Sequence, residues 1–249
     1  MFIKQVPDTD DVKWTINNNI DRANTESILN PLDKEALTAG INLKKQYGAK
    51  VNVISMGPDK AVEILKEAIA LGADEAILLS DKKFVGSDTC ATSKVLSSAV
   101  KARFPDADLI LFGQSASDGE TAQTGPSVAV RLNLPFLTHV NEIKEISEGY
   151  LTVNTETESE KVTYRIKLPA VLCINNYAVK PESPRIEGYI RAHDYNYKTY
   201  NIFDLKINEA ETGVKGSPTY VSKVYKTQEG RNCKMTDTDG ILKQIKEVC

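Results

Sequence analysis

Short apolar runs alternate with longer segments of helical periodicity through the first half of the chain. The apolar runs cover residues 2–6, 51–55, 76–79 and 109–112. Each run has the length of a short buried strand, and the segments between them repeat apolar residues every three or four positions. Because parallel strands need crossover connections, this alternation predicts an α/β domain with a parallel sheet covered by helices on both faces.

The first predicted helix has clear start and stop signals. Asn30 can cap it, Pro31 suits its first turn, and Asp33 places a carboxylate near the positive end of the helix dipole. Gly48 is expected to end it.

The pattern changes after residue 135. Shorter β-like runs follow, separated by turn residues such as Glu148-Gly149, and they predict an antiparallel addition to the sheet. These runs cover residues 136–143, 150–157, 161–168 and 171–174.

Regular periodicity is weak at both ends of the chain. Residues 8–25 are polar and can contain a hairpin. From Tyr177 onward, prolines, glycines and tyrosines indicate an extended C-terminal arm that reaches another chain, or else a tail that lies on its own domain. Residues 236–248 predict one last helix.

Four loops follow the predicted parallel strands, and ligands in such sheets bind beyond the carboxyl ends of the strands. The loops cover residues 6–11, 56–58, 83–89 and 113–126. We therefore expect them to converge on one edge of the sheet and to form the candidate site. Ser87 or Asp88 in the third loop can also cap the helix that follows and that ends near Phe104.

The fourth loop, GQSASDGETAQTGP, lies between a strand and a helix start, where free backbone N–H groups and the helix dipole favour an anion. Pro126 suits the first helical position, and Gly119 and Gly125 allow close backbone approach. The alternative is a solvated loop with a capping threonine. Spacing alone favours that alternative, because the loop matches neither the Walker A pattern nor GxGxxG.

The composition limits the function classes. The chain has 249 residues, 41% of them hydrophobic and 26% charged, which is ordinary for a globular protein. A net charge of −3 argues against general nucleic-acid binding. No apolar run in the sequence approaches the ~20 residues needed to span a bilayer, and the first residues lack a signal-peptide core, so we expect no membrane insertion and a cytoplasmic location.

The cysteines and histidines give no metal-binding pattern. The four cysteines are scattered without a CxxC motif, and the two histidines lie far apart without an HExxH motif. We expect reduced thiols and no metal site.

A set of spaced motifs runs through the chain from Lys4 to about Val221. The motifs are KQVPDT at 4–9, NPLD at 30–33, SMGP at 55–58, LGAD at 71–74, GSDT at 86–89, DGETAQTGP at 118–126 and VKGSP at 214–218. In this order they resemble the signatures of the β subunit of electron-transfer flavoproteins. Several motifs that agree in order are far more specific than one loop.

The resemblance implies an adenine nucleotide α-hydrolase-like domain over residues 1–180, and a partner-recognition segment and arm over residues 181–249 that contact an α subunit. The heterodimer of this family carries electrons as flavin. Its β subunit holds AMP in respiratory members or a second FAD in bifurcating members. Residues 86–93 and 118–123 are similar to the bifurcating branch, which favours FAD, with AMP as the alternative.

A bifurcating member would take hydride from NADH and send one electron toward ferredoxin and the other, through the FAD of the α subunit, toward an acyl-CoA dehydrogenase-type partner. Because the cofactor carries this chemistry, no catalytic acid or base is expected in the chain, and activity arises only within the complex. Two alternatives stay open. One is a non-bifurcating carrier with AMP in this site, and the other is a nucleotide-binding regulatory domain without a redox role.

The resemblance also assigns residues to the nucleotide pocket. They are Asn30, Pro31, Leu32, Asp33, Met56, Gly57, Thr121, Ala122, Gln123, Thr124, Gly125 and Pro126. Backbone N–H groups of Thr124 and Gly125, with the hydroxyls of Thr121 and Thr124, are expected to hold pyrophosphate, and Asn30 or Gln123 to bind ribose or adenine.

Four more residues belong to the predicted cofactor site. Asp88 and Thr89 either face the flavin ring or only begin a helix. Asp118 and Gly119 complete the loop, where the carboxylates of Asp118 and Glu120 are interpreted as loop-shaping or solvated rather than catalytic.

Residues 184–192 resemble the partner-recognition segment of the family. Ile186 matches its apolar anchor, and Tyr189 and Ile190 are grouped with it as partner-binding residues. The chain departs from the family in two places. Residues 193–197, HDYNY, replace a lysine run, which favours a different dehydrogenase, and the first strand is short, which either weakens the sheet centre or reflects a different start codon.

Overall fold

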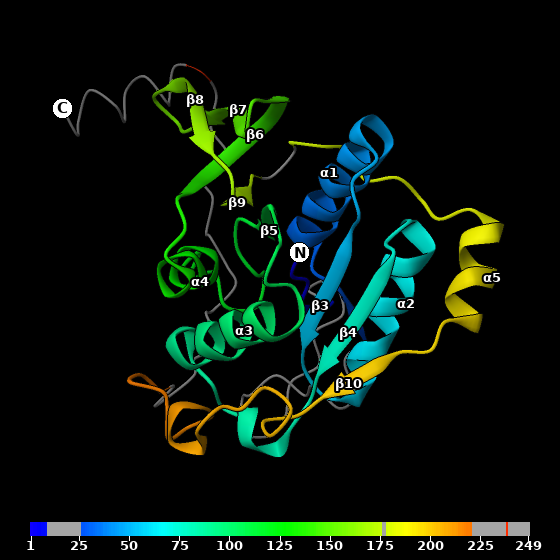
Figure 1. The fold of residues 1–249 in the computed structure, drawn as a ribbon, viewed down its shortest axis with the longest axis vertical. Helices are drawn as coiled ribbons and strands as arrows, with labels where there is room; N and C mark the ends of the chain where they lie inside the picture. The colour runs from blue at the N-terminus through cyan, green and yellow to red at the C-terminus, as the bar shows by residue number, and fades with distance from the viewer. Residues whose placement is uncertain (9–25, 176–177, 221–237, 239–249) are drawn as a thin grey trace.

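The computed structural model describes residues 1–8, 26–175, 178–220 and 238 (Figure 1). Its helices are α1 (Pro31–Tyr47), α2 (Val62–Leu71), α3 (Thr89–Arg103), α4 (Thr124–Leu132) and α5 (Ile186–Asp194), with short 3₁₀ helices at Asp59–Ala61, Lys82–Phe84 and Glu209–Glu211. Its strands are β1 (Gln5–Pro7), β2 (Ser27–Leu29), β3 (Asn52–Met56), β4 (Glu75–Leu79), β5 (Leu109–Gly113), β6 (Phe136–Ser147), β7 (Tyr150–Glu156), β8 (Lys161–Lys167), β9 (Ala170–Ile174) and β10 (Lys198–Tyr200).

Residues 1–3 join two groups of strands. One group is parallel in the order β10-β4-β3, and the other has the order β5-β9-β6-β7-β8. The N–H of Ile3 donates to the Ile54 carbonyl at 3.0 Å, and the N–H of Phe2 donates to the Leu111 carbonyl at 3.0 Å. The first residues of the chain therefore occupy the middle of the sheet, between β3 and β5.

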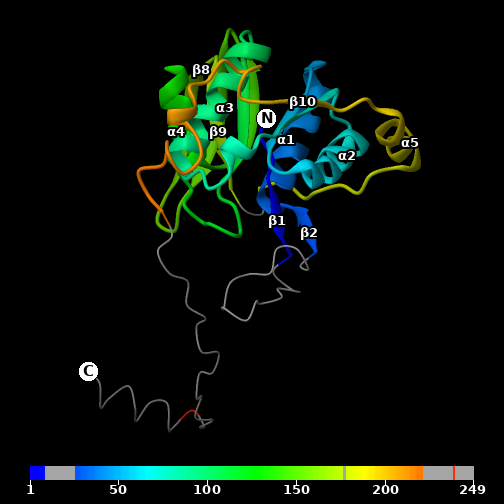
Figure 2. The same cartoon turned by 90° about the horizontal axis from the view of Figure 1, so that it is seen from below.

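The predicted first strand, residues 2–6, is only partly correct. The N–H of Lys4 donates to the Asp33 carboxylate at 2.8 Å instead of to a neighbouring strand. The chain then leaves the sheet, and β1 pairs antiparallel with β2, a strand that the sequence pattern did not predict. Figure 2 shows this pair projecting below the body of the domain.

The predicted antiparallel addition consists of β6, β7 and β8, whose pairings are antiparallel as expected. The prediction was wrong for residues 171–174. They belong to β9, which lies between β5 and β6 and runs parallel to both. All residues of β9 are buried, as suits a central strand packed on both faces, and a short apolar run does not reveal which strands it pairs with.

Helices cover both faces of the sheet, as predicted (Figure 2). Side chains alternate along β5, so Ile110 and Phe112 pack in a cluster with α3 and α4, while Leu111 packs on the opposite side with Ala36 of α1. A third cluster joins β3 and β4 to α1 and α2. The core is therefore two layers of apolar side chains separated by the sheet.

The described part of the C-terminal arm lies on its own domain and has more regular structure than predicted. α5 packs against α2 so closely that a Cβ atom on Gly188 would lie 2.1 Å from the Ala70 carbonyl oxygen. The N–H of Ala76 donates to the Tyr195 hydroxyl at 3.0 Å, and β10 then adds to the sheet beside β4. The possible hairpin within residues 8–25 and the last helix at 236–248 lie outside the described residues, apart from positions 8 and 238.

The amino-terminal edge of the sheet is under-packed at its centre. The Met1 amine donates to the Asn52 carbonyl at 2.5 Å, and burial lowers its pKa from 8.0 to about 5. Next to it lies a cavity of about 790 Å³, lined by the starts of β3 and β5 and the ends of α1 and α3. Unfilled space thus remains beside residues 1 and 2, between the starts of β3 and β5.

Candidate functional site

The loops at the carboxyl edge of the sheet meet, as the sequence predicted. The hydroxyls of Thr89, at the start of α3, and Thr121, in the loop after β5, lie 3.4 Å apart. From the segment just before the first loop, the Lys4 ammonium contacts the Asp118 carboxylate at 2.6 Å. Residues from three separate segments are therefore brought to one place.

The loop between β5 and α4 presents a run of free backbone donors. Glu120 and Ala122 adopt left-handed conformations, with φ of 47° and 52°, and Gln123 is right-handed. Within the described residues, the N–H groups of positions 121–125 have no hydrogen-bond acceptor. Alternating left- and right-handed residues that lead into a helix form a concave set of N–H groups suited to an anion.

Asn30 fastens this loop instead of capping a helix. It is buried at the N-cap position of α1, but its side chain makes no capping hydrogen bond, so the predicted side-chain cap is wrong. Its amide nitrogen donates to the Ser115 carbonyl at 2.9 Å, and its amide oxygen accepts from the Ser117 N–H at 3.2 Å. Both ends of the amide therefore hold the loop.

Asp33 ties three segments together below the loop. Its carboxylate accepts from the N–H of Lys4 at 2.8 Å and from the N–H of Gly113 at 3.0 Å. A Cβ atom on Gly113 would lie 2.6 Å from the same carboxylate, so only glycine fits there. Burial raises the pKa of Asp33 to about 7, although the hydrogen bonds from Asn30, Gly113 and Lys4 oppose this rise.

Asp88 caps α3, which confirms the helix-start interpretation. One carboxylate oxygen accepts from the Ala91 N–H at 2.9 Å, and the other accepts from the N–H and hydroxyl of Thr219 at 3.0 and 2.7 Å. Burial alone would raise the pKa of Asp88, but these hydrogen bonds outweigh it and hold the pKa below its usual value. Whether Asp88 and Thr89 also face a flavin stays a prediction.

The two loop glycines differ in their surroundings. Nothing lies within 4 Å of a Cβ atom placed on Gly119. A Cβ atom on Gly125 would lie 2.5 Å from the Cys173 sulfur, so this glycine makes room for the core. α4 also begins at Thr124, two residues before the predicted start at Pro126.

The remaining predicted pocket residues lie at the same edge. Met56 ends β3, and the N–H of Gly57 donates to the Leu79 carbonyl at the end of β4 at 3.0 Å. Pro31 and Leu32 open α1, with the Leu32 carbonyl carbon 2.6 Å from a Cβ atom placed on Gly113. The chain thus brings all the predicted cofactor residues to loops and helix starts on one edge.

The predicted partner-binding residues lie elsewhere, on α5. Ile186, Tyr189 and Ile190 are 77%, 59% and 59% exposed. Large apolar side chains exposed together on one short helix are typical of a protein-binding surface.

Sequence reasoning missed several contacts of the site. It assigned no role to Lys4, or to Ser217 and Thr219, although all three lie in or next to the quoted motifs. The motifs were the available signal, but their partners lie more than 100 residues away along the chain.

Among the described residues, no helix combines the length and apolar character needed to cross a bilayer. No group of three or more histidine, cysteine, aspartate or glutamate side chains among them is placed to hold a metal ion.

Comparison with known proteins agrees with the motifs. Residues 18–194 match the model of the electron transfer flavoprotein domain. The chain is 41% identical to the electron transfer flavoprotein subunit beta of Thermoanaerobacterium thermosaccharolyticum over 89% of this chain and 85% of that protein. It is 37% identical to the caffeyl-CoA reductase-Etf complex subunit CarD of Acetobacterium woodii, over 89% and 85%, and 35% identical to the acryloyl-CoA reductase electron transfer subunit gamma of Anaerotignum propionicum, over 95% and 91%.

Proposed function

The chain belongs to the electron transfer flavoprotein family, among its β subunits, and we propose that it binds FAD at the carboxyl edge of its sheet. The observation that carries this proposal is the run of free N–H groups at positions 121–125, in a loop whose Thr121 hydroxyl lies 3.4 Å from the Thr89 hydroxyl at the start of α3. Backbone donors and hydroxyls fit the phosphates of a nucleotide.

In the proposed complex, the chain pairs with an α subunit and passes electrons from NADH to ferredoxin and, through the FAD of the α subunit, to or from an acyl-CoA dehydrogenase-type partner. Bound FAD would supply the chemistry, by accepting two electrons as hydride and releasing them singly. The names of the relatives from Acetobacterium and Anaerotignum, which contain acyl-CoA reductases, support a partner of that class.

The residues of this chain would bind and orient the nucleotide. N–H groups of Thr121 to Gly125 and the hydroxyls of Thr89 and Thr121 would hold the phosphates. Asn30 and Asp33 would fix the loop that presents those donors, because both side chains contact its backbone. Ile186, Tyr189 and Ile190 on α5 would contact the dehydrogenase.

The first test is the nucleotide content of the heterodimer. The chain is expressed with its α subunit, and the FAD and AMP released on denaturation are quantified. Two FAD per heterodimer are expected. One FAD and one AMP would contradict the bifurcating proposal and favour the non-bifurcating carrier, and bound ATP without flavin would favour a regulatory domain.

The second test is a charge placed in the loop. Thr121→Asp puts a negative charge beside the free N–H groups and is expected to abolish nucleotide retention, while Thr121→Asn has nearly the same shape and is expected to retain it. Thr121 is exposed, so neither change disturbs the core. Gly125→Asp is less suitable, because its side chain would also meet Cys173. Equal retention by both Thr121 variants would mean that the phosphates bind elsewhere.

A further inference from the structure

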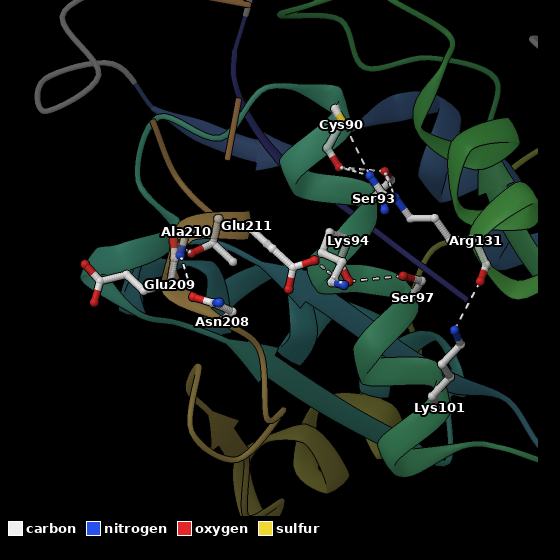
Figure 3. Close-up of polar contacts among 11 residues, drawn as sticks. Cys90, Ser93, Lys94, Ser97, Lys101, Arg131, Asn208, Glu209, Ala210 and Glu211 are labelled. Atoms are coloured by element: carbon white, nitrogen blue, oxygen red, sulfur yellow. Dashed lines mark hydrogen bonds and ion pairs between the residues drawn. The ribbon is translucent and has the colours of Figure 1, made fainter. Parts of the chain in front are cut away.

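Residues 208–219, here called the strap, lie across the start of α3. The Lys94 ammonium of α3 contacts Glu211 of the strap at 2.6 Å, as Figure 3 shows, and Lys83 contacts Glu209 at 2.7 Å. These pairs are partly exposed and contribute little energy, and they join the strap to α3 and to the 3₁₀ helix before it.

Beneath the ion pairs, two hydroxyls of the strap hold Asp88. The Ser217 hydroxyl accepts from the Asp88 N–H at 2.8 Å and donates to the Gly213 carbonyl at 2.6 Å. The N–H and hydroxyl of Thr219 both donate to the Asp88 carboxylate. The strap therefore holds the backbone and the side chain of this residue at once.

The backbone of the strap is closely constrained at Gly213. Gly213 has a φ of 58°, which favours glycine, and a Cβ atom there would lie 2.4 Å from the Lys83 carbonyl oxygen. The N–H of Gly213 donates to the Ser87 hydroxyl at 3.0 Å. The close contact at Gly213 and this hydrogen bond hold residues 213–219 against residues 86–88.

Asp88 immediately precedes Thr89, whose hydroxyl faces Thr121 in the proposed phosphate cradle. A carboxylate that could turn toward this cradle would repel phosphate and compete for its N–H donors. The Asp88 carboxylate is instead occupied by the Ala91 N–H on one oxygen and by Thr219 on the other. The contacts with the strap thus keep the negative charge of the Asp88 carboxylate from turning toward the cradle. Because Thr89 follows Asp88 directly, they also set the position of Thr89.

We propose that Ser217 and Thr219 are positioning residues for the nucleotide pocket, so that seating of the strap and binding of the nucleotide favour each other. This inference rests on the proposed nucleotide site. Because coupling between two binding events is reciprocal, a nucleotide that gains affinity from the seated strap must also stabilise the strap. If the strap had a purely structural role, binding of the nucleotide would not stabilise the strap.

The test uses the dialysed heterodimer with FAD and, in parallel, AMP as probes. Calorimetric titration should show affinity at least five-fold weaker for Ser217→Ala and about three-fold weaker for Thr219→Val, which has the same shape without the hydroxyl. Thr219→Ser keeps the hydroxyl and should restore affinity to within two-fold. Tyr195→Phe removes a comparable hydroxyl contact at the other edge of the sheet and should leave affinity unchanged.

The return effect is measured by hydrogen exchange of a peptide that covers the strap. Added nucleotide should slow its exchange several-fold in the wild type and much less in Ser217→Ala. Wild-type affinity in Ser217→Ala and Thr219→Val, or strap exchange that nucleotide does not change, would overturn the inference while leaving the proposed site intact. A wild-type heterodimer whose β site binds neither probe would overturn both.

Discussion

The two edges of one sheet are built in opposite ways. At the carboxyl edge, side chains from distant segments tie the loops together, as Asp33 does for Lys4 and Gly113. At the amino edge, residues 1–3 lie between β3 and β5, and the buried Met1 amine borders a cavity of about 790 Å³. The centre of the edge where the proposed ligand binds is thus held by side-chain contacts, and the centre of the opposite edge contains unfilled space.

Each edge also contains a buried titratable group, and the two groups differ in their hydrogen bonds. Asp33 keeps hydrogen bonds to two backbone N–H groups, whereas the Met1 amine has the Asn52 carbonyl as its hydrogen-bond acceptor. Burial shifts both pKa values toward the neutral forms, up for the acid and down for the amine. The following changes test this contrast, from the largest expected effect to the smallest.

Removing the Asp33 carboxylate should be the most damaging change. Asp33→Ala leaves the N–H groups of Lys4 and Gly113 without their acceptor, and we expect the free energy of unfolding to fall by about 3 to 5 kcal/mol. Asp33→Asn keeps one acceptor oxygen and should lose roughly half as much. Urea unfolding of the two variants measures the difference, and equal losses would mean that a single amide oxygen does not replace the carboxylate as acceptor for the two N–H groups.

Filling the amino edge should have the opposite sign. Adding strand-forming residues such as Thr-Val-Val, after a new initiating Met, replaces the buried amine by a peptide N–H and places apolar side chains near the cavity. We expect stability to rise by about 3 kcal/mol at pH 7, from the restored amide and buried methyl groups. A Gly-Ser-Gly extension of equal length is the control, and equal gains from both would show that the cavity is not filled.

The two titrating groups should give opposite pH dependences. The Asp33 pKa is raised from 3.8 to about 7, so the unfolded chain binds fewer protons and stability falls as pH rises from about 4 to about 7. The Met1 pKa is lowered from 8.0 to about 5, so stability rises from about pH 5 to about pH 8. Between pH 5 and 7 the two slopes, each at most about 1.4 kcal/mol per pH unit, should nearly cancel in the wild type.

Two variants separate the pH dependence of stability that is due to Asp33 from the one that is due to the Met1 amine. Asp33→Asn should leave only the rise with pH, and the extended chain should leave only the fall. Thermal unfolding across pH 4 to 8 measures both. If Asp33→Asn keeps the wild-type profile, the buried carboxylate does not titrate in this range.

The sequence predicted the parallel strands and their covering helices because alternation of apolar runs and helical periodicity is a local signal. The position of β9 was not predictable in this way, because its neighbours β5 and β6 are chosen by packing across the whole sheet. For the same reason the arm was expected to lack regular structure, although α5 and β10 form by contact with α2 and β4.

The sequence predicted which loops form the site, but it did not predict which side chains connect them. The free N–H groups before α4 follow from a loop that enters a helix, and the structure agrees. Asn30 was interpreted as a cap because an asparagine before Pro31 is a local cap signal, but its partners Ser115 and Ser117 lie 85 and 87 residues away. The contact between Gly125 and Cys173 was not predictable either, because the pattern does not show which core side chain lies behind the loop.

The smallest effect is expected at the surface of the carboxyl edge. The Lys4 side chain is 47% exposed, and its contact with Asp118 at 2.6 Å is a partly solvated ion pair. Lys4→Met keeps the aliphatic length without the charge and should lower stability by less than about 1 kcal/mol, with a difference that shrinks further in high salt. Because the N–H of Lys4 still donates to Asp33, the loop anchor remains, and nucleotide affinity should change less than in Asn30→Ala. A loss as large as that of Asp33→Ala would show that the charge, and not the backbone contacts, holds this edge together.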